Sequence, residues 1–147
     1  MPSEDDAPAV ELDGVTRRYG ETTAVDDVSL AVEEGEFFTL VGPSGCGKTT
    51  TLRLLAGFEA PTAGTVRFDG ESVAGVPPED RDVGVVFQSY ALFPHMTVGE
   101  NVASGLNFAD PPGRVSTAQR VAALLDLVDL AGMPARDPAT LSVAQQQ

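Results

Sequence analysis

The chain has 147 residues, of which 42% are hydrophobic and 21% charged, and its formal net charge is −13. This composition predicts a folded domain with an apolar core and excludes an intrinsically disordered chain. The strong negative charge argues against a nucleic-acid partner, because phosphate groups would be repelled. An acidic, lysine-poor composition is typical of proteins from salt-rich cytoplasm, with ordinary compositional drift as the alternative.

The start of the chain and its single cysteine bear on location. The first nine residues are acidic and contain no apolar segment, so we expect a tail rather than a secretion signal. No apolar run approaches the ~18 residues of a membrane-spanning helix. Cys46 has no second cysteine to pair with, which fits a reducing cytoplasm.

The first half of the chain predicts strands of two kinds. Alternation of apolar with smaller or polar residues is typical of strands with one buried face, and it occurs over residues 10–15, over residues 24–32 and around Val66 and Phe68. Two denser apolar runs, residues 37–41 and 83–87, predict strands covered on both faces, as in a parallel sheet.

The second half of the chain is helical in pattern. Three capping boxes, in which Ser or Thr precedes Glu or Gln by three residues, predict helix starts at Thr97, Ser116 and Ser142. The helix after Ser116 is expected to end near Gly132 and Pro134. One face of it is expected to carry Val121, Leu124, Leu125 and Val128.

A phosphate-binding motif follows the first dense apolar run. The pattern G-x-x-x-x-G-K-T is formed by Gly42, Gly47, Lys48 and Thr49. A buried strand is expected before the motif, and after it a helix over residues 49–56 that Gly57 ends. The glycines let successive backbone N–H groups point at phosphate oxygens, and the helix N-terminus adds partial positive charge.

Lys48 is the only lysine of the chain. Its ammonium is expected to reach the β- and γ-phosphates as a point charge, a task for which the wider, planar guanidinium of arginine is unsuited. Thr49 is expected to offer its hydroxyl to Mg²⁺, and Thr50 to donate to a neighbouring phosphate. Cys46 is interpreted as a small filler, with a redox role as the alternative. The expected nucleotide-binding residues are Gly42, Pro43, Ser44, Gly45, Cys46, Gly47, Lys48, Thr49 and Thr50.

The chain resembles the ATP-binding subunit of ABC transporters over nearly all of residues 10–147. The stretches that carry the resemblance are RRYG, GEFFTLVGPSGCGKTTTLRLLAGFEAPTAGTVRFDG, RDVGVVFQSYALFPHMTVGENV and, more weakly, LSVAQQQ. The resemblance implies an incomplete α/β P-loop NTPase core with an antiparallel β subdomain. We expect a tail over residues 1–9, a nucleotide-binding core over 10–88 and the start of a helical subdomain over 89–147.

The resemblance also assigns roles outside the loop. Tyr19 corresponds to the aromatic residue that stacks on adenine, with packing of a strand-end tyrosine on the core as the alternative. Gln88 corresponds to the glutamine whose amide oxygen reaches Mg²⁺ and the attacking water, with a solvated loop residue as the alternative. Residues 89–97 correspond to the region that faces the membrane subunits, with ordinary packing as the alternative. His95 is assigned no metal role, because it lacks partners.

The function implied by the resemblance is that of a transport ATPase. Such a subunit binds ATP and Mg²⁺, pairs head to tail with a second ATP-binding subunit, and hydrolyses ATP to power import through membrane permease subunits. It is cytoplasmic and lies on the inner face of the cell membrane. Within the family, the chain is most similar to importer ATPases that serve polyamines, ferric iron, sugars or sulfate.

The chain departs from the family pattern at its signature segment. Family members carry Leu-Ser-Gly-Gly-Gln where residues 141–145 read LSVAQ, so Ser142 keeps a hydroxyl for the γ-phosphate of the partner's nucleotide while two glycines are missing. The β-branched Val143 adds bulk there, and we expect weaker dimer closure. The family's later strand ending in Asp-Glu is not part of the sequence, which favours a truncated, catalytically inactive nucleotide-binding remnant or interaction module as the alternative.

Overall fold

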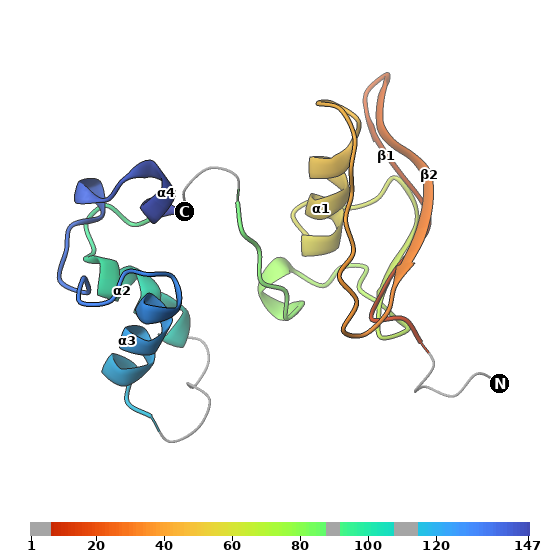
Figure 1. Ribbon diagram of the computed structural model, residues 1–147. Coiled ribbons are helices and arrows are strands. Elements are labelled where there is room, and N and C mark those ends of the chain that lie inside the picture. The colour runs from red at the N-terminus through yellow and green to blue at the C-terminus, as the bar shows by residue number, and fades with distance from the viewer. Residues whose placement is uncertain (1–6, 88–91, 108–114) are drawn as a thin grey trace. The chain divides into compact units, whose positions relative to one another are not determined.

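The computed structural model describes residues 7–87, 92–107 and 115–147. The chain forms two compact units, residues 1–85 and 86–147 (Figure 1). The first contains the strands and one helix, and the second is helical. Within the described ranges, no helix has the length and apolar character needed to cross a membrane.

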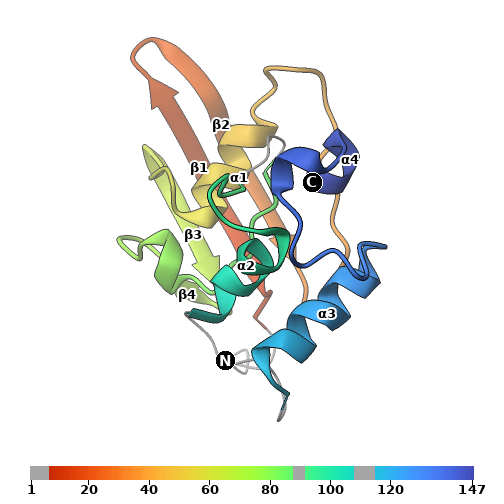
Figure 2. The ribbon, with the colours of Figure 1, turned by 90° about the vertical axis from the view of Figure 1, so that its left-hand side faces the viewer.

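The first unit is built on a four-stranded antiparallel sheet with the order β2-β1-β3-β4 (Figure 2). Strands β1 (Val10–Tyr19) and β2 (Thr22–Val32) form a long hairpin. Strand β3 (Ala63–Phe68) pairs with the other edge of β1, and the short β4 (Glu71–Ser72) follows it. These strands confirm the three alternating segments expected from the sequence.

An apolar core joins this sheet to helix α1 (Lys48–Ala56). Its buried members are Leu12, Val15, Val25, Leu54, Val66 and Val73. Leu12 and Val66 are paired across β1 and β3, and Leu54 comes from α1. Burial of an aliphatic side chain of this size contributes ~1.5–3 kcal/mol. The core therefore holds α1, and with it the loop that precedes α1, on the sheet.

The prediction that residues 37–41 and 83–87 form buried strands is wrong. Neither segment takes part in the sheet of the described residues. Three side chains expected to be buried are exposed instead: Phe37 at 94%, Val41 at 89% and Val86 at 84%. A strand depends on backbone hydrogen bonds to a neighbour, and apolar composition does not supply that neighbour.

The second unit contains α2 (Val98–Ala103), α3 (Thr117–Leu127) and α4 (Val143–Gln146). All three predicted capping boxes are formed, and their N-cap residues are Thr97, Ser116 and Ser142. An N-cap of this kind stabilises its helix by ~1 kcal/mol. Single-turn 3₁₀ helices occur in both units; they are η2 (Pro78–Asp80), η3 (Ser104–Asn107) and η4 (Pro138–Thr140).

Helix α3 ends earlier than expected, at Leu127 rather than near Gly132. Asp129 adopts a left-handed conformation with a φ of 60°, and the N–H of Leu130 turns back to the carbonyl oxygen of Leu125 at 2.8 Å. These local hydrogen bonds end the helix before the glycine is reached.

The early end of α3 also alters its expected apolar face. Val121 and Leu125 are buried and Leu124 is half-buried, but Val128 is exposed. Val128 follows the last helical turn, so it no longer faces the core. The buried core of this unit consists of Val98, Val121, Leu125, Leu130 and Leu141.

Candidate functional site

The glycine-rich segment lies directly before α1 and is seated on β2. Gly45 and Gly47 take φ values of 81° and 95°, and the helix begins at Lys48. A Cβ atom at Gly47 would lie 2.4 Å from the carbonyl oxygen of Ala24 on β2. Glycine is therefore required at position 47 both for the left-handed backbone and for the close approach of the loop to the strand.

The start of α1 presents N–H groups without partners inside the helix. Gly47, as the N-cap, supplies no side-chain acceptor, and the first helical bond runs from the N–H of Thr51 to the carbonyl oxygen of Gly47 at 2.9 Å. The N–H groups of Lys48, Thr49 and Thr50 therefore lack a helical acceptor. Oxygens of an anion satisfy such groups, and the helix dipole adds positive potential there.

The side chain of Lys48 folds back over the loop. Its Nζ atom donates to the carbonyl oxygen of Gly42 and to that of Pro43, the latter at 2.9 Å, and lies 3.4 Å from the Sγ atom of Cys46. The ammonium is thus held beside the start of its own helix instead of extending into solvent. A phosphate at this helix end meets N–H donors and a cation together.

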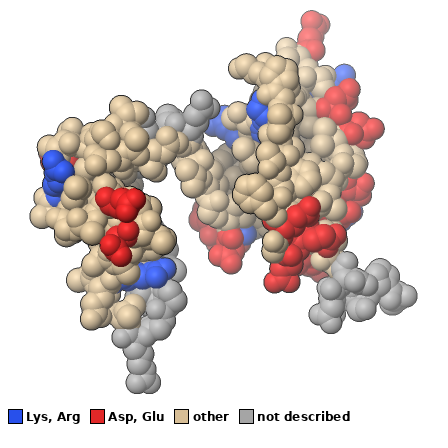
Figure 3. All heavy atoms as spheres, viewed as in Figure 1, with Lys and Arg blue, Asp and Glu red and all other residues tan. Residues whose placement is uncertain are grey.

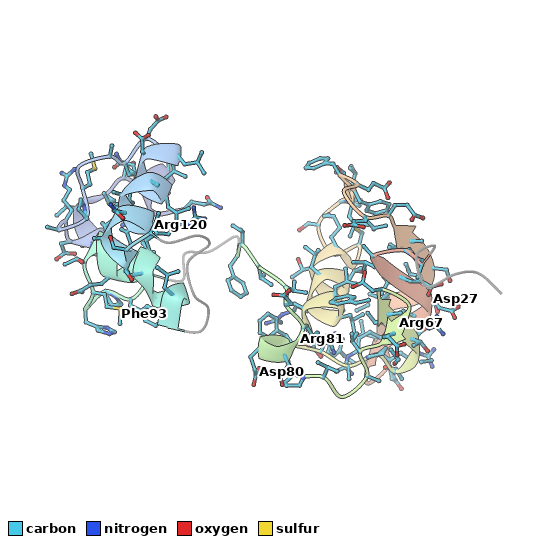
Figure 4. All side chains as sticks on the ribbon, turned by 90° about the horizontal axis from the view of Figure 1, so that it is seen from below. Asp27, Arg67, Asp80, Arg81, Phe93 and Arg120 are labelled. Carbon is cyan, nitrogen blue, oxygen red and sulfur yellow. The ribbon has the colours of Figure 1, made fainter. Side chains whose placement is uncertain are left out.

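Arg81 fixes the other end of α1, and the sequence analysis missed it. Its guanidinium donates at 2.8–3.1 Å to the backbone carbonyl oxygens of Leu54, Leu55, Val73 and Val76. Figure 4 labels Arg81 beside Asp80. Burial lowers the pKa of Arg81, yet arginine keeps its proton at neutral pH, so a cation lies at the C-terminal end of α1. Gly57 leaves room for it, because a Cβ there would lie 2.6 Å from its Nε atom.

Tyr19 ends β1, on the same hairpin as Ala24, which contacts the glycine loop. The ring is only partly covered, since 42% of the residue is exposed. The guanidinium carbon of Arg17 lies 4.6 Å from the ring centroid, so a cation covers one face of the ring. Arg17 was not predicted from the sequence, although its spacing of two from Tyr19 puts both side chains on one face of a strand.

Two further residues, Gln88 and Ser142, were also predicted for the site. Gln88 lies outside the described residues. Ser142 is in the second unit, where its hydroxyl accepts from the N–H of Gln145 at 3.2 Å and its own N–H donates to the Gln145 side chain. Val143, next to it, is 67% exposed. The first unit therefore brings together the loop of residues 42–50 and the Tyr19 hairpin.

Part of the region expected to face membrane subunits is described, as residues 92–97. There the side chain of Asn101 accepts from the N–H of Phe93 at 2.8 Å and donates to its carbonyl oxygen at 3.1 Å. A cavity of about 610 Å³, lined mostly by apolar side chains, adjoins this segment inside the second unit.

No group of three or more His, Cys, Asp or Glu side chains in the described ranges is arranged to hold a metal ion. Thr49, whose residue is exposed in the first turn of α1, carries a hydroxyl oxygen of the kind that Mg²⁺ takes as a ligand.

Comparisons with known proteins agree on one family. The sequence profile described as ABC transporter matches residues 25–147. The chain is 58% identical over 140 residues to the spermidine/putrescine import ATP-binding protein PotA of Rubrobacter xylanophilus, covering 95% of this chain and 37% of that protein. It is 54% identical over 144 residues to the protein of the same name from Thermobifida fusca, with the same coverage of 95% and 37%. The chain thus spans 37% of the length of these curated relatives.

Solved structures show the same relationship. The dimeric structure of a bacterial ABC transporter cassette matches with a TM-score of 0.79 at 33% identity, over 93% of this chain and 65% of that one. The structure of an ATP-binding subunit of an ABC transporter matches with a TM-score of 0.80 at 23% identity, over 94% of this chain and 58% of that one, which supports the fold alone. The chain therefore belongs to the ABC transporter family and represents its ATP-binding domain.

Proposed function

We propose that this chain is the nucleotide-binding part of an importer-type ABC ATPase and that residues 42–50 hold the phosphates of ATP. One observation carries the proposal: the Lys48 ammonium and the unpartnered N–H groups of the first turn of α1 meet at one exposed loop. Neutral carbonyl oxygens now accept from Lys48. Phosphate oxygens are stronger acceptors because they are charged, so a triphosphate competes well for the same donors.

Each residue of the proposed site has a distinct task. Lys48 neutralises the β- and γ-phosphates, Thr49 contributes its hydroxyl to Mg²⁺, and Thr50 donates to a neighbouring phosphate. Tyr19 stacks on adenine. Gln88 orients Mg²⁺ and the attacking water through its amide oxygen. The other proposed nucleotide-binding residues shape the loop or face the nucleotide; they are Gly42, Pro43, Ser44, Gly45, Cys46, Gly47 and Ser142.

The proposed assembly follows from the relatives. The solved cassette at 33% identity is dimeric, which supports a dimer of ATP-binding subunits here, and the resemblance to the family adds the head-to-tail arrangement. The relatives at 58% and 54% identity are named as import ATP-binding proteins, which supports a partnership with membrane permease subunits. We assign this contact to residues 89–97, at the inner face of the membrane, from the resemblance of the sequence to the family. Their names favour a polyamine as the imported solute.

The second candidate function is nucleotide binding without turnover, as in a remnant or an interaction module. Val143 and Ala144 stand where a backbone has to approach a phosphate closely, and the exposed Val143 side chain adds bulk at that point. The Ser142 hydroxyl accepts from the N–H of Gln145, which leaves its O–H free to donate, so the bulk at position 143 is the feature that counts. This bulk weakens contact with a γ-phosphate while leaving the loop of residues 42–50 intact.

Replacement of Lys48 by alanine tests the binding site. Loss of one charge-assisted donor is expected to weaken ATP·Mg²⁺ binding by about 10- to 100-fold. Isothermal titration calorimetry at high ionic strength measures the effect, because high salt screens the acidic surface. Arg53→Ala is the matched control, since it removes a cation from the last turn of the same helix.

Three results bear on the site and on the two candidate functions. A folded Lys48→Ala variant with unchanged ATP affinity contradicts the proposed site. Steady ATP hydrolysis by the unaltered chain, lost in Lys48→Ala, excludes the second candidate and supports the ATPase. Binding without hydrolysis supports the second candidate instead.

A further inference from the structure

Arg17 and Tyr19 form a stacked pair near the tip of the β1–β2 hairpin. They are two residues apart on β1, so their side chains leave the same face of the strand. The guanidinium carbon lies 4.6 Å from the centroid of the tyrosine ring. A cation at this distance from an aromatic face is attracted by the ring quadrupole.

Two contacts from the segment after α1 hold the guanidinium in place. Its Nη2 atom lies 2.9 Å from the Oε2 atom of Glu59, and its Nη1 atom donates to the carbonyl oxygen of Ala60 at 2.8 Å. The side chains of Arg17 and Glu59 are only 25% and 21% exposed. A planar guanidinium bound at two nitrogen atoms has little freedom to rotate, so its flat face stays against the ring.

The segment that supplies these contacts is attached to β1 independently of Arg17. The N–H of Thr62 donates to the carbonyl oxygen of Thr16 at 2.7 Å, and the N–H of Arg18 donates to the Thr62 hydroxyl at 3.0 Å. These two hydrogen bonds do not involve the Arg17 side chain, so they remain available to hold the segment when that side chain is replaced.

We propose that Arg17 is a positioning residue that holds the Tyr19 ring so that a nucleobase stacks on the face that Arg17 leaves open. The inference rests on the proposed function, because it assigns adenine to Tyr19. A half-exposed tyrosine loses side-chain freedom when a base stacks on it, and that loss weakens binding. Arg17 restricts the Tyr19 side chain already before a nucleotide binds, because its guanidinium packs on one face of the ring.

The test compares ATP with inorganic tripolyphosphate, both with Mg²⁺, by calorimetry on the whole chain. Tripolyphosphate has the phosphates but no base, so its affinity reports the loop alone. Arg17→Met is expected to weaken ATP binding roughly threefold, and Tyr19→Leu about tenfold, with tripolyphosphate unchanged in both variants. The double variant is expected to match Tyr19→Leu, because Arg17 acts through the ring.

Matched variants separate positioning from structural damage. Arg18→Met removes the same charge one residue along, from a side chain bonded to the Thr23 hydroxyl, and is expected to leave the ratio of the two affinities unchanged. Arg17→Lys keeps the positive charge but loses the planar guanidinium. We therefore expect its ATP affinity to lie between that of Arg17→Met and that of the unaltered chain. Glu59→Gln removes the negative charge that holds the Arg17 guanidinium but keeps the size of the side chain. It therefore replaces Arg17→Met if that variant does not fold.

Failure of the inference differs from failure of the proposed function. Equal loss of ATP and tripolyphosphate affinity in Arg17→Met, or no loss of either, overturns the positioning role while the loop assignment stands. Failure of the unaltered folded chain to bind either compound overturns the proposed function itself, and the inference with it.

Discussion

Gly47 is the residue on which the geometry of the phosphate loop depends most directly. Its φ of 95° is in the left-handed region, and the carbonyl oxygen of Ala24 occupies the space that a side chain would need. Lys48, the next residue, takes its direction from this backbone and returns to the carbonyl oxygens of Gly42 and Pro43. The position of the Lys48 ammonium therefore depends on residue 47 being a glycine, which has no Cβ atom.

Gly47→Ala is expected to weaken ATP·Mg²⁺ binding at least tenfold, because the left-handed backbone costs an alanine ~1–2 kcal/mol and the clash with β2 adds to it. Calorimetry measures the affinity, and thermal unfolding checks the fold. Gly75→Ala is the matched control: its φ is 76°, its Cβ would meet no atom within 4 Å, and it lies outside the loop. A Gly75→Ala variant that binds ATP as weakly as Gly47→Ala would contradict the role of the contact with Ala24.

Helix α1 is held at both ends by different means. Its N-terminus is seated on β2 through Gly47, and its C-terminus is held by Arg81, which bonds the carbonyl oxygens of Leu54 and Leu55. Carbonyl groups in the last turn of a helix have no helical partner, and a cation there also complements the dipole. The helix is thus oriented with its free N–H groups at the loop and its carbonyl groups at an arginine.

Arg81→Lys is expected to lower the free energy of unfolding by ~2–3 kcal/mol, because an ammonium cannot reach four carbonyl oxygens at once. Urea unfolding followed by circular dichroism measures the change. Arg53→Lys, at an exposed position on the same helix, is the control and is expected to change stability by less than ~0.5 kcal/mol. An equal effect of the two variants would show that the carbonyl contacts do not stabilise the helix.

The whole molecule carries a net charge of −13, and Figure 3 shows acidic side chains gathered over the unit that contains the sheet. Like charges repel in the folded state, and salt shortens the range of this repulsion from ~10 Å at 0.1 M to ~3 Å at 1 M. The melting temperature is therefore expected to rise with potassium chloride at neutral pH. Near pH 4.2, the isoelectric point, the net charge is close to zero, so the same salt series is expected to change the melting temperature very little. A melting temperature insensitive to salt at pH 7 would argue for compositional drift instead.

Features that depend on neighbouring residues were predictable from the sequence. The three capping boxes and the Gly57 stop are confirmed, because each is decided by residues within about one helical turn. The phosphate-binding motif and the stretches around it also predicted the ABC transporter family, and the match to the family over residues 25–147 confirms this prediction. The roles at the nucleotide stay predictions for every assigned residue, from Tyr19 and the loop of residues 42–50 to Gln88 and Ser142.

Only the tertiary structure decided the features that join distant parts of the chain. Residues 37–41 and 83–87 read as strands, yet pairing depends on a neighbour that no local pattern supplies. Arg81 reaches a helix end 26 residues away, and Arg17 reaches Ala60 across 43 residues. The amino-acid sequence by itself indicated the glycine-rich motif and the helix after it, because their pattern is contained in a few neighbouring residues. The contacts that hold this segment in place became visible only in the tertiary structure. They are made to backbone carbonyl groups, which every residue type has, so the sequence does not indicate them.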